Sequence, residues 1–473
     1  MKVEIGSQLT IREPTQEVVR WIRAELEIVN PEYAKKKRMG FYVGNIPKVL
    51  YLYEVIDKNV IVVPFGCLRS LIELMQDAEC ESLFVPHQLI DYKFINDNGE
   101  ETDAKVPLYE YQETAVNKMI INHYGILQSP AGSGKTQMGI AIAVKMRKKC
   151  LWLTHTKDLL TQSLQRAAQY IDITSLGVIT EGKVEIGECI TFATIQTMCN
   201  LNLELYKNMW DVIIVDECHR VAGTPTAVTR FSKVLNILAA RHKYGLSATV
   251  HRADGMIKAT YALLGQVVYT VPDEAVAEKI MQVTVQPLFT GVGLSTDFLN
   301  SDGTISYYKM IDYLIGNTNR NYYIQGGLRK AYKHYNLILS ERVSHLNTLY
   351  NLLPKPLQET AAVIDGKTKK EVREQALNDM REGKLHYLFA TYPLAKEGLD
   401  IPRLDRLFLV TPQKDYAVIV QSVGRIARTF PGKKSPMVYD YVDNIRSLEK
   451  SYKKRCTHYR KCGCRFIGEN NEE

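Results

Sequence analysis

The chain has 473 residues, which is too long for one ordinary domain and predicts about three domains. Its composition, with 45% hydrophobic and 24% charged residues, is close to the globular average and excludes a disordered or fibrous protein. Lysine and arginine outnumber aspartate and glutamate by 60 to 52, and the resulting net charge of +8 favours a polyanionic partner.

The sequence predicts neither a membrane span nor a secreted protein. No run approaches 18 apolar residues, and the first residues lack the apolar segment of a signal peptide. The nine cysteines are odd in number and mostly scattered, which argues against a disulfide framework and for a reducing compartment. We therefore expect a cytoplasmic protein.

Residues 1–105 read as a small accessory domain of α+β type. A helix is predicted over 15–29, and a basic run follows at 35–38. Short strands are predicted at 49–53 and 60–63. The tract 91–107 is rich in Asn, Asp and Gly and ends in proline, which is typical of a linker.

Residues 106–287 alternate apolar strand candidates with helix candidates, which predicts a parallel sheet covered by helices on both faces. Buried parallel strands are expected to be continuous apolar runs. The runs that fit are GILQS (125–129), CLWLT (150–154), CITFA (189–193) and DVIIVD (211–216).

This rhythm is lost over 288–330, which we interpret as an insertion or a connection between two lobes. It returns over 331–445, which predicts a second sheet of the same kind. The strands of that sheet are predicted at NLILS (336–340), AAVID (361–365), YLFAT (387–391) and RLFLVT (406–411). Residues 446–473 read as a basic tail.

The segment SPAGSGKT, residues 129–136, has the context of a phosphate-binding loop, because a strand candidate precedes it and a helix candidate follows. Gly132 and Gly134 let backbone N–H groups turn toward phosphate, Lys135 reaches the β and γ phosphates, and Thr136 holds magnesium. Ser129 stands where the strict pattern has glycine, and Ser133 completes the loop.

The run DVIIVDECH ends in two carboxylates where a parallel strand would deliver them to its carboxyl edge, and ligands bind at that edge. Asp216 is expected to hold the magnesium ion, and Glu217 to polarise the water that attacks the γ-phosphate. ATP and Mg²⁺ are therefore the expected cofactors.

These segments resemble the motif series of superfamily 2 helicases, in the order of that family. LYEYQ (108–112) resembles the Q motif, SPAGSGKT motif I, DECH (216–219) motif II and SAT (247–249) motif III. The resemblance implies two lobes of RecA type with ATP bound between them. It implies that Gln112 reads the adenine, and that His219, Ser247 and Thr249 couple the ATP site to the rest of the lobe.

Two further segments resemble motifs Ia and Ib, by which the family grips the nucleic-acid backbone: THTKDLLTQ (154–162) and TFATIQTM (191–198). Uncharged donors of this kind position a strand without reading its sequence. The expected backbone contacts are Thr154, His155, Thr194, Gln196 and Thr391.

In the second lobe, ATYPLAKEGLDIP (390–402) resembles motif V and QSVGRIAR (421–428) resembles motif VI. Arg425 and Arg428 lie three apart and would share a helix face. The resemblance implies that both stabilise charge on the transferring phosphoryl group from the opposite lobe. It also implies that Gly398 and Asp400 complete the cleft and that Gln421 takes part in coupling.

The segment SATVHRADGM (247–256) and the N-terminal region resemble the XPB-like branch of the superfamily and the phage helicases of recombination and branch migration. This branch implies an ATP-dependent DNA helicase or translocase that acts on forked, branched or single-strand/duplex junction DNA in replication, recombination or repair. The N-terminal domain is then expected to bind DNA, and no oligomer is required. If a phage encodes the chain, the compartment is the host cytoplasm.

Cys456, His458, Cys462 and Cys464 lie within nine residues of the basic tail and leave two interpretations open. One is a zinc site, although the spacing of Cys462 and Cys464 is tighter than the usual gap. The other, which we favour, is a set of phosphate contacts from the lysines and arginines of the tail.

Three other functions remain compatible with the sequence. A double-strand translocase uses the same motor without separating strands. An RNA helicase differs in the nucleic acid that stimulates its ATPase. A DNA-binding protein with a vestigial nucleotide cleft belongs to another class, and it is disfavoured because every catalytic position is filled.

Overall fold

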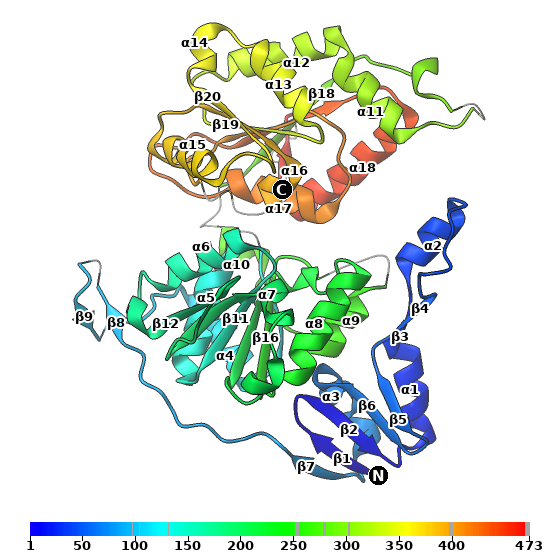
Figure 1. The fold of residues 1–473 in the computed structure, drawn as a ribbon. Helices are drawn as coiled ribbons and strands as arrows, with labels where there is room; N and C mark the ends of the chain where they lie inside the picture. The colour runs from blue at the N-terminus through cyan, green and yellow to red at the C-terminus, as the bar shows by residue number, and fades with distance from the viewer. Residues whose placement is uncertain are drawn as a thin grey trace. The chain divides into compact units, whose positions relative to one another are not determined.

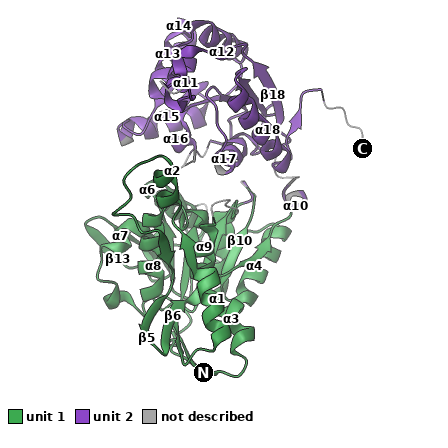
Figure 2. Ribbon diagram, turned by 90° about the vertical axis from the view of Figure 1, so that its right-hand side faces the viewer, with its two compact units in different colours: residues 1–130, 134–272 green, residues 131–133, 273–473 purple. Residues whose placement is uncertain are grey.

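The computed structural model describes residues 1–473 except 97, 104, 131, 251–254, 278–280, 301–302, 397–398, 400 and 469–473. The chain forms two compact units, which are described separately below (Figures 1 and 2). Unit 1 contains residues 1–130 and 134–272, and unit 2 contains residues 131–133 and 273–473.

Unit 1 begins with a five-stranded sheet in the order β5-β6-β2-β1-β7. The strands are β1 (Lys2–Ile5), β2 (Gln8–Arg12), β5 (Glu54–Asp57), β6 (Val60–Pro64) and β7 (Glu79–Ser82). Helix α1 (Gln16–Leu26) packs on it through Val18, Ile22 and Leu26. A separate ribbon of β3 (Glu27–Val29) and β4 (Val49–Tyr51) carries helix α2 (Pro31–Arg38).

The N-terminal sheet shares its core with the parallel-sheet lobe of unit 1. Apolar side chains of the following segment, η1 (Phe65–Cys67), α3 (Leu68–Leu71) and η2 (Ile72–Met75), join the same cluster as Ala259 and Ala262. Gly66 permits close backbone approach, because a Cβ there would lie 2.6 Å from the Ala262 carbonyl oxygen. This accessory region is therefore packed into unit 1 rather than tethered to it.

Lys243 lies at the junction between the N-terminal sheet and the parallel-sheet lobe of unit 1. Its buried amine donates to the carbonyl oxygens of Ser7 at 3.0 Å and Leu235 at 2.6 Å, and it lies over the ring of Phe65. Burial lowers the pKa of the Lys243 amine to about 7.

The predicted linker is held against the lobe along much of its length. Tyr92 is buried and its hydroxyl donates to the Lys148 carbonyl oxygen at 2.9 Å. The tract also contains a short antiparallel pair, β8 (Phe94–Ile95) with β9 (Glu101–Thr102), so it is not structureless.

The lobe has an eight-stranded sheet in the order β13-β12-β14-β11-β15-β16-β10-β17. All neighbours are parallel except β12 and β13. The strands are β10 (Gly125–Gln128), β11 (Cys150–Thr154), β12 (Leu176–Thr180), β13 (Lys183–Glu185), β14 (Ile190–Thr194), β15 (Val212–Asp216), β16 (His242–Ser247) and β17 (Val267–Thr270).

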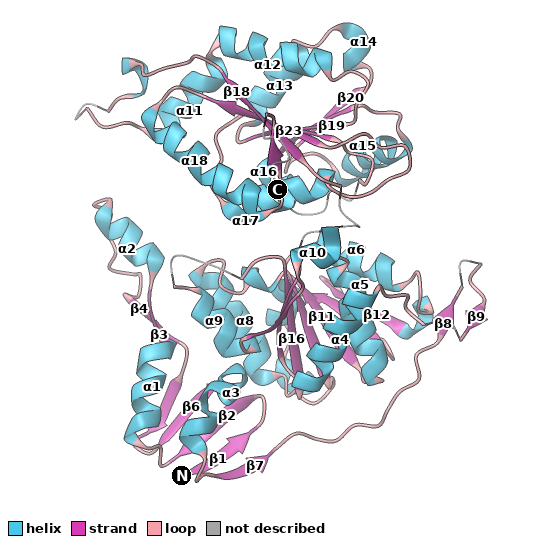
Figure 3. Cartoon of the chain, turned by 180° about the vertical axis from the view of Figure 1, so that it is seen from behind, coloured by secondary structure: helices cyan, strands magenta, loops and turns pink. Residues whose placement is uncertain are grey.

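Helices cover both faces of this sheet (Figure 3). Helices α7, α8 and α9 share one apolar cluster with Leu151, Leu153 and Ile213. On the other face, α5 approaches so closely that a Cβ on Gly139 would lie 2.6 Å from the Trp152 ring. The helices are α4 (Glu110–Asn122), α5 (Lys135–Met146), α6 (Lys157–Ala167), η3 (Ile173–Ser175), α7 (Ile195–Cys199), η4 (Leu203–Tyr206), η5 (Cys218–Arg220), α8 (Pro225–Ile237) and α9 (Ile257–Leu264).

Unit 2 has a seven-stranded parallel sheet in the order β20-β21-β19-β22-β23-β18-β24. The strands are β18 (Thr284–Phe289), β19 (Asn336–Ser340), β20 (Ala361–Ile364), β21 (Tyr387–Thr391), β22 (Arg406–Leu409), β23 (Met437–Val442) and β24 (Arg465–Phe466). The helices are α10 (Asp273–Ala277), η6 (Thr296–Phe298), α11 (Tyr307–Gly316), α12 (Thr318–Lys330), α13 (Val343–Asn351), α14 (Lys355–Gln358), α15 (Lys370–Glu382), α16 (Tyr392–Lys396), α17 (Tyr416–Ile426) and α18 (Arg446–Lys461).

Two layers of helices enclose the sheet of unit 2. Alternate side chains of β19 point to opposite faces: Leu337 and Leu339 pack with α15, α17 and α18, and Ile338 packs with α12 and α13. The predicted class, an α/β fold with two RecA-like parallel-sheet lobes and a small N-terminal α+β region, is confirmed. No described helix is long and apolar enough to cross a membrane.

The predicted limits of several segments need correction. The first helix ends at Leu26, and the β-branched residues that follow form β3 instead. Residues 273–287, which the sequence analysis assigns to the first lobe, belong to unit 2, where β18 pairs with β23. The predicted insertion 288–330 ends in α12, whose Ile324 and Leu328 lie in the core of unit 2.

The basic tail is also part of the fold. Helix α18 packs on the sheet through Tyr459, and Arg455 is only 2% exposed. The Arg455 guanidinium donates to both oxygens of Asp440 on β23, at 2.8 and 2.9 Å, and to the Gln413 carbonyl oxygen. Arg455 therefore holds unit 2 together and is not a phosphate contact.

We expect Arg455→Ala to destabilise the protein by about 3–5 kcal/mol, since it leaves the Asp440 carboxylate buried without its cation. The midpoint of thermal unfolding reports this loss. Lys454→Ala, an exposed neighbour on the same helix, is the matched control and should leave the midpoint unchanged. An unchanged midpoint for Arg455→Ala would contradict the structural role.

Candidate functional site

The loop between β10 and α5 has the backbone of a phosphate-binding loop. Gly132 and Gly134 take φ of +86° and +82°, a region that favours glycine. Ser129 stands where the strict pattern has glycine. It is buried, and its N–H donates to the Ser247 carbonyl oxygen at 2.9 Å. The sequence pattern and the strand–loop–helix context predicted this loop.

Lys135 opens helix α5, and Thr136 follows it in the first turn. The Lys135 Nζ atom donates to the carbonyl oxygens of Ser129 at 3.4 Å and Pro130 at 3.3 Å. The amine thus lies across the loop at a helix N-terminus, where backbone N–H groups and the helix dipole favour an anion.

Gln112 adjoins the loop, as the resemblance implied. It is 3% exposed, and its Oε1 accepts from the Tyr109 N–H at 3.0 Å in the capping box of α4. A Cβ on Gly134 would lie 2.4 Å from its amide nitrogen, and the φ of +82° at Gly134 itself favours glycine. The Gln112 amide therefore lies against the phosphate-binding loop.

Asp216 ends β15 in the same lobe, and Glu217 follows the strand directly. Burial, and then the charge of Glu217, raise the pKa of the Asp216 carboxyl to about 7, and Lys135 acts in the opposite direction. Glu217 takes a left-handed backbone conformation with φ of +49°, which turns the chain sharply after the strand. Paired carboxylates near a lysine suit a divalent cation and a phosphate chain.

A line of polar contacts connects these carboxylates to the segment after β16. The His219 Nδ1 atom lies 3.2 Å from Glu217 Oε2 and 3.1 Å from Ser247 Oγ. Ser247 Oγ in turn donates to the Thr249 carbonyl oxygen at 2.7 Å. Three of the four residues predicted to take part in coupling, His219, Ser247 and Thr249, are thus in one network.

The described residues of this site fit ATP and Mg²⁺. The loop and the α5 N-terminus offer N–H groups and one ammonium to phosphates, Gln112 offers an amide edge, and Thr136 with Asp216 offers oxygen ligands. Magnesium, when bound, supplies charge neutralisation at the β and γ phosphates. Glu217 follows Asp216 directly and adds a second carboxylate to the site.

In unit 2, the predicted residues come from β21 and α17. Thr391 ends β21 and Gln421 and Arg425 lie on α17; the Arg425 Nε atom donates to the Ala395 carbonyl oxygen at 3.2 Å. Helix α17 ends at Ile426, so Arg428 lies beyond it and does not share a helix face with Arg425, contrary to the prediction.

Two further predicted residues of this half, Gly398 and Asp400, lie outside the described residues. Gln421 is 9% exposed, and its Oε1 has no hydrogen-bond partner among the described residues.

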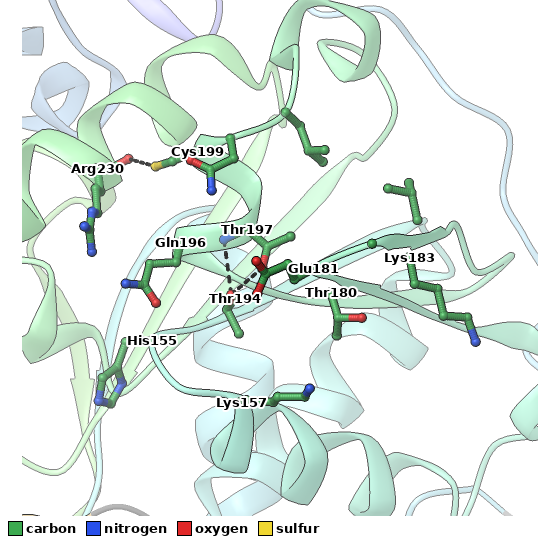
Figure 4. A pocket seen from close by; sticks show the side chains of 14 residues that line it. His155, Lys157, Thr180, Glu181, Lys183, Thr194, Gln196, Thr197, Cys199 and Arg230 are labelled. Carbon is green, nitrogen blue, oxygen red and sulfur yellow. Dashed lines mark hydrogen bonds between the residues drawn. The ribbon is translucent and has the colours of Figure 1, made fainter.

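A groove of about 670 Å³ lies in the same lobe (Figure 4). The ends of β11, β12 and β14 form its floor, and β14 and β15 flank β11 in the sheet. Three predicted nucleic-acid contacts line it, His155, Thr194 and Gln196. The cations Lys157, Lys183 and Arg230 line it too, and sequence analysis did not single them out.

Thr154 does not line the groove. It is fully buried, and its hydroxyl donates to the Thr156 carbonyl oxygen at 3.0 Å. Thr194 is 8% exposed and caps α7 by accepting from the Thr197 N–H at 3.2 Å. The side chains that the groove offers to a strand are therefore chiefly cations and amides.

The cysteines and histidine of the tail are dispersed by the fold. Cys464 is buried in the core beside β18, whereas His458 packs edge-on against Tyr416. Among the described residues, no three His, Cys, Asp or Glu side chains are grouped so as to hold a metal.

Two family models match the chain. The model of the type III restriction enzyme res subunit matches residues 105–252, and the model of the helicase conserved C-terminal domain matches residues 319–430. Together they cover both lobes and more than half of the chain. The chain belongs to the superfamily 2 helicases, a family of ATP-hydrolysing enzymes.

Relatives of this superfamily 2 helicase include members of the XPB-like and phage branches. The DNA 3′-5′ translocase XPB2 of Sulfurisphaera tokodaii is 25% identical over 68% of this chain and 79% of its own length. The ATP-dependent DNA helicase UvsW of enterobacteria phage T4 is 21% identical over 91% of this chain and 87% of its own. Both branches were expected from the sequence.

A protein of Acanthamoeba polyphaga mimivirus named as an ATP-dependent RNA helicase is 26% identical over 71% of this helicase, which spans 64% of that relative. Among solved structures, yeast Dbp5 bound to RNA and ADP BeF₃ matches with a TM-score of 0.52 and 17% identity, covering 76% of this chain and 89% of Dbp5. That likeness shows the shared two-lobe fold.

Proposed function

We propose that this helicase hydrolyses ATP to move along DNA and remodels forked or branched DNA, as in replication, recombination or repair. One observation carries the proposal: the paired carboxylates and the cationic groove arise from neighbouring strands of one sheet. Asp216 ends β15, His155 follows β11 and Thr194 ends β14. A strand in the groove can thus influence the ATP site through a rigid element.

The proposed cycle uses the polar network that joins Glu217 to Ser247 and Thr249. Nucleotide binding changes the charge around Asp216 and Glu217, and the network carries that change toward the segment after β16. The motor needs ATP, Mg²⁺ and one copy of the chain, acting in the cytoplasm. The names of the relatives support nucleic acid as partner, and those of UvsW and XPB2 favour DNA.

ATP hydrolysis measured side by side with single-stranded, duplex and forked DNA and with RNA tests the proposal. Forked DNA should stimulate the rate most, and strands should separate in a displacement assay. Displacement of a third strand from a triplex without strand separation would indicate a double-strand translocase. A rate stimulated by RNA alone would identify an RNA helicase, and a rate that no nucleic acid stimulates would refute the motor.

The groove gives a prediction of its own. Arg230→Gln should weaken DNA binding and reduce the dependence of log Kd on log salt by about one unit, because one phosphate contact is lost. Glu181→Gln, in the same groove, should strengthen binding by removing a repelling carboxylate. A titration of labelled single-stranded DNA at several salt concentrations measures both.

Lys118→Gln, on the exposed surface of α4, is the matched control for loss of one cation. It should change neither affinity nor salt dependence. If Arg230→Gln and Lys118→Gln had equal effects, the groove would have no special role and net charge alone would explain binding.

A further inference from the structure

Residues 30–48 form an arm that stands on the ribbon of β3 and β4, and Figures 1 and 3 show α2 at its outer end. Asn30 closes its base, because its Nδ2 donates to the Pro47 carbonyl oxygen at 2.9 Å. The Asn30 Oδ1 accepts from the Glu32 N–H at 3.0 Å and so caps α2. The fold of the arm is therefore specified by its own residues.

The arm exposes side chains that proteins usually bury. The structure describes all of residues 31–51, and none of them is buried. At the end of α2, Met39 is 58% exposed, Phe41 59% and Tyr42 83%. Three large apolar side chains gathered at one exposed tip mark an interaction site. Nothing in the packing of unit 1 accounts for them.

The arm is also strongly basic. Between Asn30 and Lys48 the sequence has five cations and one carboxylate. Lys36 pairs with that carboxylate, Glu32, at 2.9 Å, whereas Lys35 and Arg38 form no ion pair with any described residue. The arm thus offers uncompensated positive charge beside exposed aromatic rings.

The cations surround the helix. Lys35, Lys36, Lys37 and Arg38 are consecutive, and successive residues of an α-helix are rotated by about 100°, so the four cover about 300° of its circumference. A single flat anionic surface could contact only about half of them. The helix fits best where negative charges face it from more than one side.

The positive charge around α2 and the exposed aromatic rings beside it favour some classes of partner over others. A membrane surface is disfavoured, because α2 has no apolar stripe to insert between lipids. A branch in nucleic acid presents phosphates on two departing strands and, between them, the faces of unpaired bases. Cations suit the phosphates, and exposed aromatic rings stack on bases of any sequence.

We propose that this arm enters the branch point of a forked DNA substrate, where the cations of α2 bind phosphates of both departing strands and Phe41 and Tyr42 stack on the first unpaired bases. This inference rests on the proposed function and specifies how the N-terminal region selects its substrate. It gives the arm a role that the two RecA-like lobes do not supply.

The test compares binding of labelled forked DNA, linear duplex and single strand to the full chain carrying Phe41→Ala with Tyr42→Ala. Affinity for the fork should fall about tenfold, while affinity for the linear duplex, which has no unpaired bases, stays at the unsubstituted value; a smaller loss is expected for the single strand, which lacks the branch. Strand separation from the fork should slow in parallel. The triple variant Lys35→Gln, Lys37→Gln and Arg38→Gln should lower the salt dependence of fork binding by about two to three units.

Tyr51→Ala with Lys58→Gln is the matched control, since both side chains are exposed in the same region but outside the arm. It should leave fork binding unchanged, and all variants should unfold at the same temperature. Equal losses of affinity for the fork and for the linear duplex would show that the arm binds duplex DNA whether or not it is branched, and would overturn the branch assignment. No loss of affinity at all would overturn it too. If no nucleic acid stimulated ATP hydrolysis but the fork-specific loss persisted, the proposed motor would fail and the arm would stand.

Discussion

Replacing Lys135 with alanine is expected to abolish ATP hydrolysis while DNA binding in the groove persists. Lys135 brings an ammonium to the N-terminus of α5, 3.3–3.4 Å from the loop carbonyls of Ser129 and Pro130. Loss of one preorganised donor to a transferring group typically slows a reaction by about 100-fold or more. The rate of phosphate release with saturating DNA should fall by at least that factor.

The control for this change lies on the same helix. Lys145 is in the last turn of α5, and its amine pairs with Glu113 at the surface. Lys145→Ala removes an equal charge far from the loop and should leave turnover unchanged. Turnover at the unsubstituted rate in Lys135→Ala would refute the ATP site, and loss of DNA binding in that variant would show that it disrupts the lobe.

The buried parallel strands were the part of the fold most readable from the sequence. The runs CLWLT, NLILS and YLFAT coincide with β11, β19 and β21 residue for residue. Strands buried on both faces need apolar side chains on both, so they form unbroken runs that loops interrupt cleanly. Edge and accessory elements carry no such signal, and the ribbon of β3 and β4 was missed in part for this reason.

The role of individual cations could not be read from the sequence. Arg455 belongs to a run of basic residues, yet it is paired with Asp440 in the core, and Arg320 is likewise paired with Asp443 at 2.7 Å. Partners far apart along the chain decide which cations are neutralised. A cluster of charges in sequence therefore predicts a basic surface only where the fold leaves it exposed, as it does on α2.

The site was predicted best where chemistry fixes both residue and spacing. The loop, the carboxylates and the coupling residues follow one another as the strand order requires, and His219, Ser247 and Glu217 are in one network. Residues that bind the nucleic-acid backbone are less constrained in type and spacing, because any exposed donor can bind phosphate. Thr154 consequently proved to be buried, and the groove draws Arg230 from a helix outside the motifs.

Arg425→Ala is expected to bind nucleotide normally but to hydrolyse it about 1,000-fold more slowly, because the resemblance assigns this arginine to the charge of the transferring phosphoryl group. Arg425 lies in the last turn of α17, and its Nε donates to the Ala395 carbonyl oxygen of α16, which holds the guanidinium against that neighbouring helix. Titration with a fluorescent nucleotide and a single-turnover rate separate binding from hydrolysis.

Two companion variants show whether geometry or charge alone matters at Arg425. Arg425→Lys keeps the charge but loses the planar fork, so it should recover only a small part of the rate. Arg446→Ala removes an exposed arginine from α18 and should leave both quantities unchanged. Arg428 lies beyond the end of α17, so its substitution tests an arginine that this helix does not hold in place. Equal falls in nucleotide affinity and rate for Arg425→Ala would contradict the finger role, since a group that acts on the transition state alone leaves ground-state binding intact.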